Sequence, residues 1–200
     1  MLFQLNEFIL GELRTLRKQQ RIERREAQTS SSALQKSTGL LSSLAGLFHQ
    51  GNPSTEQITE SAQAYVNGMC SLQDEIEEEY DAFLLDPGMG PMCYLTSQGQ
   101  VLIDGRSWDD TGIRFAEEDE AIAVLVVGAK KLDAPYLLTL IPEAPPHAQT
   151  CPWCDGERRA ALYPGMEHKF ICIICHGRGW ADERLMNNYH EHKKRMEEVK

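Results

Sequence analysis

The residues with the clearest chemistry in this sequence are four cysteines in two Cys-x-x-Cys pairs, Cys151 with Cys154 and Cys172 with Cys175. Each pair can present two thiolates from one tight turn, and four thiolates complete a tetrahedral shell around a borderline-soft cation such as Zn2+. The seventeen residues between the pairs are enough for an out-and-back hairpin. The spacing therefore predicts one structural zinc ion held by all four cysteines.

Two glycines occupy matching places, Gly156 and Gly177, two residues after the second cysteine of each pair. A side chain there would obstruct the turn and the backbone amides that can hydrogen-bond the sulfurs. The nearby His147, His168 and His176 are predicted not to be ligands, because four cysteines already complete the shell. Protein atoms then fill every coordination position, so the predicted zinc is structural and not catalytic.

The repeat Cys-x-x-Cys-x-Gly, with Gly-Arg-Gly in its second copy, resembles the cysteine-rich zinc region of DnaJ-type chaperones over residues 151–180. This resemblance implies that the four cysteines are zinc ligands and that the segment is a paired-knuckle β-hairpin. The chain departs from that family in having two repeats where the family has four, and Glu157-Arg158 replaces the final x-Gly of the first repeat. It also lacks a His-Pro-Asp tripeptide. The resemblance therefore extends to the metal site and to protein binding, but not to co-chaperone activity.

Composition excludes several classes of protein. The chain is 42% apolar and 25% charged, as globular proteins are, and no apolar run approaches the roughly 20 residues of a membrane span.

The N-terminus lacks a basic region, and Glu7 and Glu12 interrupt its apolar residues, so a signal peptide is not expected. Six cysteines without an export signal point to a reducing compartment, and the cytoplasm is the expected location. A net charge of −10 disfavours nucleic acid as a partner.

Residues 1–28 are predicted to form an amphipathic helix with a strongly basic second half, Arg14 to Arg25. Three roles remain open for it: docking on a partner protein or in a coiled coil, contact with a membrane surface, or packing on its own domain. The membrane role is the least favoured. Residues 29–53 are rich in Ser and Gly and are predicted to be a linker.

Residues 54–145 are predicted to form an α+β domain. Ser54 should cap a long helix that continues to Asp86, and its acidic run is expected to be a solvated face. Four strands should follow in an antiparallel sheet packed on this helix, and the third, apolar at every position, should be central. The expected strands are Met92–Ser97, Gln100–Asp104, Ala121–Val127 and Tyr136–Ile141.

The acidic residues between these strands, among them Asp104 and Glu120, are expected to form turns and face solvent, and Cys70 and Cys93 are expected to be small core residues. A zinc-stabilised hairpin over residues 146–181 should follow. Residues 182–200 should form a closing amphipathic helix capped by Asp182. His190 and His192 should point to different faces of that helix and be exposed.

The leading functional hypothesis is a non-enzymatic intracellular adaptor that binds another protein, with the N-terminal helix as a candidate docking element. It rests on a closed metal site, three amphipathic helices and no catalytic motif. One alternative is a thiol-redox switch or chaperone-like factor that uses the Cys-x-x-Cys pairs. Another is single-stranded nucleic-acid binding through a basic and aromatic surface on the hairpin. Its candidate residues are Trp153, Arg158, Arg159, Lys169, Arg178 and Trp180.

Overall fold

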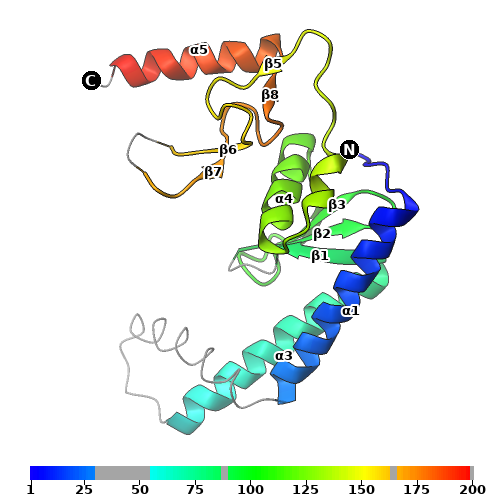
Figure 1. The fold of residues 1–200 in the computed structure, drawn as a ribbon. Coiled ribbons are helices and arrows are strands. Elements are labelled where there is room, and N and C mark those ends of the chain that lie inside the picture. The colour runs from blue at the N-terminus through cyan, green and yellow to red at the C-terminus, as the bar shows by residue number, and fades with distance from the viewer. Residues whose placement is uncertain (30–54, 87–89, 163–165, 199–200) are drawn as a thin grey trace. The chain divides into compact units, whose positions relative to one another are not determined.

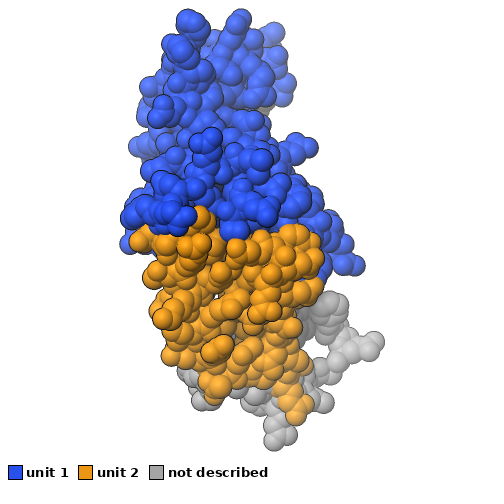
Figure 2. Space-filling model, turned by 90° about the vertical axis from the view of Figure 1, so that its right-hand side faces the viewer, with its two compact units in different colours: residues 1–9, 85–200 blue, residues 10–84 orange. Residues whose placement is uncertain are grey.

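The computed structural model describes residues 1–29, 55–86, 90–162 and 166–198. The chain divides into two compact units, coloured separately in Figure 2. One unit is Leu10–Leu84, and the other combines Met1–Ile9 with Leu85–Lys200. Apart from Thr29, the predicted linker and the proposed cap Ser54 lie outside the described residues.

The unit of residues 10–84 contains most of helix α1 (Glu7–Thr29) and all of helix α3 (Thr55–Glu79), which run antiparallel and lie side by side in Figure 1. Ion pairs hold them in antiparallel register: Arg24 pairs with Asp74 of α3, and Arg17 pairs with Asp81, two residues beyond the end of α3, each at 2.9 Å. Three roles were left open for the N-terminal helix. The structure shows one of them, packing on its own chain, for the face of α1 that contacts α3.

The acidic run of α3 is not simply a solvated face, as the sequence had suggested. The Glu77 side chain is fully buried, and its Oε2 lies 2.8 Å from both Arg21 Nε and Arg24 Nη2. A carboxylate can be buried in this way only when cations and hydrogen bonds replace its hydration. The neighbouring Glu78 remains exposed, so the register against α1 decides which acid is buried.

The sheet has four strands in the order β1-β2-β3-β4, and the β2–β3 and β3–β4 pairs are antiparallel. The α+β class is as predicted, and so are β2, β3 and the turn at Gly99, which has a φ of +82°. The prediction that the long helix continues to Asp86 is wrong. The helix ends at Glu79, and Asp81, which has a left-handed backbone conformation, leads into the first strand. The strands are β1 (Ala82–Asp86), β2 (Met92–Thr96), β3 (Val101–Asp104) and β4 (Ile113–Phe115).

Two further predicted strands are wrong. The apolar run 121–127 lies in a helix, α4 (Glu118–Lys131), and residues 136–141 belong largely to a 3-10 helix, η1 (Pro135–Leu140). A reciprocal capping box between Glu117 and Glu120 starts α4. The fully buried Ile122 and Leu125 follow a helical period and not the period of two that a strand would require.

One acidic residue that was predicted to face solvent, Asp104, is instead the buried last residue of β3. Asp104 is fully buried, and its two carboxylate oxygens accept hydrogen bonds from Arg106 Nε and Nη2 at 3.0 Å. Cys70 and Cys93 are buried as predicted, and burial raises the pKa of Cys93 to about 12. Within the described ranges, no helix is both long enough and apolar enough to cross a membrane.

The C-terminal part contains two short antiparallel ladders and a helix (Figure 1). One ladder pairs β5 (Gln149–Thr150) with β8 (Trp180–Ala181), and the other pairs β6 (Arg159–Ala160) with β7 (Phe170–Ile171). Helix α5 (Glu183–Glu198) closes the chain. Its predicted cap is confirmed, because the Leu185 amide donates to Asp182 Oδ1 at 2.9 Å.

Candidate metal centre

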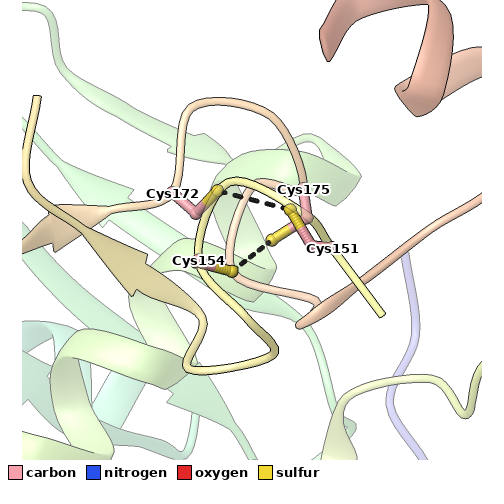
Figure 3. A group of neighbouring side chains, drawn as sticks. All are labelled: Cys151, Cys154, Cys172 and Cys175. Atoms are coloured by element: carbon pink, nitrogen blue, oxygen red, sulfur yellow. Dashed lines mark hydrogen bonds between the residues drawn. The ribbon is translucent and has the colours of Figure 1, made fainter. Parts of the chain in front are cut away.

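All four predicted ligand cysteines are buried in one cluster, and their Sγ atoms lie within 4.8 Å of one another (Figure 3). The Sγ atoms of Cys151 and Cys172 are 3.7 Å apart, and so are those of Cys154 and Cys175. A zinc–sulfur bond of about 2.3 Å gives a tetrahedron with an edge of about 3.8 Å, whereas a disulfide would need about 2.05 Å. The four side chains therefore fit a tetrahedrally coordinated metal ion.

The backbone presents the two knuckles in the same way, with approximate two-fold symmetry. The Cys151 amide donates to Gly179 O at 3.1 Å, and the Cys172 amide donates to Arg158 O at 3.0 Å. Each acceptor lies four residues after the second cysteine of the opposite pair. The two knuckles therefore hold each other in place through their backbones as well as through the sulfur atoms.

Left-handed backbone conformations recur at matching places in the two knuckles. Gly156 has a φ of +82° and Gly177 a φ of +89°, which explains the glycines that the sequence singled out. Gly179 has a φ of +83°, and Arg158, its counterpart in the first knuckle, adopts a φ of +66°. Arg158 tolerates this conformation while its Nη1 donates to the carbonyl oxygens of Gly177 and Arg178.

The electrostatics of the cluster favour a cation. Hydrogen bonds from the thiols of Cys154 and Cys172, and from the Gly179 amide at 3.4 Å, hold the pKa of Cys175 well below its usual range. The pKa of Cys172 is raised, chiefly because its thiol donates within the same cluster. Additional buried thiolates would repel the thiolate of Cys175, and a bound metal ion would remove that repulsion.

The second knuckle is fixed to helix α4 by a buried arginine. Arg178 is 3% exposed, with Nη1 2.6 Å from Asp119 Oδ1 and Nη2 2.7 Å from Glu118 Oε1. Both acids lie in the first turn of α4. The sequence does not reveal that these two acids bind Arg178, because no spacing rule connects residues about sixty positions apart. The only local signal is a pair of acids beside a capping box.

Three residues of the predicted binding surface are therefore structural. Arg178 and Arg158 make the contacts given above, and Trp180 Nε1 donates to Pro142 O at 3.1 Å. Their hydrogen-bonding groups face the protein and not a ligand. The predicted basic surface is correspondingly smaller than the sequence suggested.

The other three, Trp153, Arg159 and Lys169, line an open groove of about 480 Å³ beside the cysteine cluster, with Cys154 also in its lining. Tyr189 of α5 also lines it and packs edge-on to Trp153, with ring centroids 6.5 Å apart. The His192 ring lies 4.8 Å from Trp153, so it packs against the knuckle, which corrects its predicted exposure. His190 is exposed as predicted.

Replacing Gly177 with Ala is expected to lower the free energy of unfolding by about 1–2 kcal/mol. Its φ is unfavourable for alanine, and the new Cβ would lie 3.1 Å from Val126 Cγ2. Gly68→Ala is the matched control, since nothing lies within 4 Å of its Cβ and its place within α3 predicts a gain of about 0.5–1 kcal/mol. Thermal unfolding of both variants checks the prediction, and shifts of the same sign would contradict it.

Comparison with family models, with curated proteins and with solved structures finds no match for this chain. Fold and site together define an α+β protein with a four-cysteine cluster able to hold a metal ion.

Proposed function

We propose that this chain is a zinc-binding interaction module without catalytic activity of its own. One Zn2+ on Cys151, Cys154, Cys172 and Cys175 shapes a surface that a partner protein contacts. Zinc is the ion of choice because four thiolates at a tetrahedral edge length are its usual structural ligand set. The DnaJ-type resemblance supports this ligand set. The cytoplasm remains the expected compartment, since reducing conditions keep the thiols available for metal.

The observation that carries the proposal is the position of the groove relative to the metal ligands. The four cysteines are at most 5% exposed, and the groove that Trp153 and Tyr189 line lies directly beside them, with Cys154 among its lining residues. Four protein ligands leave no coordination position for water or substrate, so the ion is expected to support a surface and not to react. Aromatic side chains and arginine are enriched at protein interfaces, and the groove offers Trp153, Tyr189 and Arg159.

Single-stranded nucleic acid is a weaker candidate, because Arg158, Arg178 and Trp180 are engaged within the protein. A thiol switch is the second candidate. The 3.7 Å separation of Cys151 and Cys172 sulfurs favours it, since peroxide could join them in a disulfide and release the metal while being reduced to water. Peroxide that leaves both zinc and thiol count unchanged would eliminate this alternative.

Affinity capture tests the interaction proposal, with a tagged chain expressed in its native source and proteins quantified by mass spectrometry. The wild type should recover a stoichiometric partner, and Trp153→Ala should lose most of it while retaining zinc. Trp108→Ala removes a tryptophan that is 60% exposed and lies away from the groove, so it should behave as wild type. Recovery of bait alone, or equal recovery by both variants, would contradict the proposal.

A further inference from the structure

Helix α1 carries a second groove, of about 300 Å³, which belongs entirely to the unit of residues 10–84. Five cations surround one apolar side chain along about three helical turns. The lining residues are Arg14, Arg17, Lys18, Arg21, Ile22 and Arg25. In a chain with a net charge of −10, this is a local concentration of positive charge that the overall composition hides.

The cations of this groove are neutralised unequally. Arg17 pairs with Asp81, and Arg21 pairs with Glu77. Lys18 and Arg25 are exposed and form no ion pair within the part of the chain that the structure describes. Ile22 lies between them and is 42% exposed. A complementary surface would therefore bring carboxylates to Lys18 and Arg25 and an apolar side chain to Ile22.

The packing of α3 shows what kind of element α1 accepts. The ion pairs 17–81, 21–77 and 24–74 advance by three or four residues along both chain segments, so α3 and the Asp81 that follows it place acidic side chains along one flank of α1. Cations also occupy the exposed flank, where Arg14, Lys18 and Arg25 are spaced by four and seven residues and therefore lie near one helix face.

We propose that this basic groove of α1 binds an acidic amphipathic helix of a partner protein. Carboxylates two helical turns apart would meet Lys18 and Arg25, and an apolar side chain would cover Ile22. The inference deepens the proposed interaction function and rests on it. Phosphate backbones fit less well, because they need a broad set of unneutralised cations, and Asp81 and Glu77 already neutralise Arg17 and Arg21.

Fluorescence anisotropy tests this with a labelled helical peptide that carries Glu at three-and-four spacing around a central Leu. The same peptide with Gln in place of Glu is the probe control. The zinc-loaded full chain should bind the Glu peptide, and Lys18→Glu with Arg25→Glu should weaken binding by about tenfold or more. Lys193→Glu with Lys194→Glu makes the same charge change on exposed residues of α5 and should leave affinity unchanged.

Circular dichroism and zinc content establish that both double variants remain folded. Equal affinity for the Glu and Gln peptides, or equal weakening by both double variants, would overturn the proposal. Tighter binding of single-stranded RNA of matched length would also overturn it. So would light scattering that shows a dimer of the wild type and a monomer of the Lys18→Glu, Arg25→Glu variant, because a second copy of the chain would then occupy the groove. Any of these results would leave the zinc content and the partner capture through Trp153 standing, so failure of the groove is distinguishable from failure of the proposed function.

Discussion

Removal of the metal is expected to unfold the segment from Cys151 to Trp180, and Cys172→Ser is expected to abolish binding of one zinc ion per chain. The ladders β5–β8 and β6–β7 have two residues per strand, and the buried cluster of this segment is four cysteines with Ala160 and Ile174. Structural zinc contributes about 10–16 kcal/mol in small zinc modules at pH 7, which matches or exceeds the whole stability of a typical domain. The apparent melting temperature should therefore fall sharply on chelation.

Metal analysis by mass spectrometry, with hydrogen exchange before and after chelation, measures this effect. Protection of the Cys151 and Cys172 amides, which donate to Gly179 and Arg158, should disappear with the metal. Cys70→Ser is the matched control, since it removes a buried thiol outside the cluster and should leave zinc content unchanged. A chain verified as metal-free that keeps its melting temperature and its amide protection would disprove the structural role.

The four-cysteine cluster could be predicted from the sequence because its determinants are local. Two ligands of each knuckle lie three residues apart, and a glycine at a fixed offset allows the left-handed turn that follows, as at Gly177. The cap at Asp182 and the turn at Gly99 were predictable for the same reason, since each acts on a backbone group only a few residues away.

The apolar run 121–127 was misassigned because it fits a buried strand and a buried helix equally well. The evidence that decides between them lies outside the run, in the capping box of Glu117 and Glu120. The role of Arg178 could not be predicted by any local rule. A positively charged residue within Gly-Arg-Gly suggested a binding surface, whereas the fold brings the first turn of α4 against it and buries it.

The burial of Glu77 could not be predicted by a local rule either, because its partners Arg21 and Arg24 lie on another helix. Two neighbouring substitutions test how much this burial contributes to the free energy of unfolding. Glu77→Ala is expected to lower the free energy of unfolding by about 3–5 kcal/mol, as when one partner of a buried ion pair is removed. The Arg24 side chain is only 10% exposed, and its Nε and Nη1 already lack hydrogen-bond partners in the described structure. Without the Glu77 carboxylate, this largely buried charge would keep the ion pair with Asp74, which is 51% exposed and compensates it less well.

Glu78 is the matched control, because it is the next residue of the same helix and also faces Arg21, at 3.9 Å. Its side chain is 73% exposed, so Glu78→Ala should cost at most about 1 kcal/mol. Urea unfolding followed by circular dichroism at 222 nm compares the two variants. Equal losses would mean that the α1–α3 pairing does not depend on the buried ion pair. A loss confined to Glu77→Ala would instead establish that the acidic run holds the basic helix in register through one residue, while its neighbours keep the solvated role that the sequence suggested.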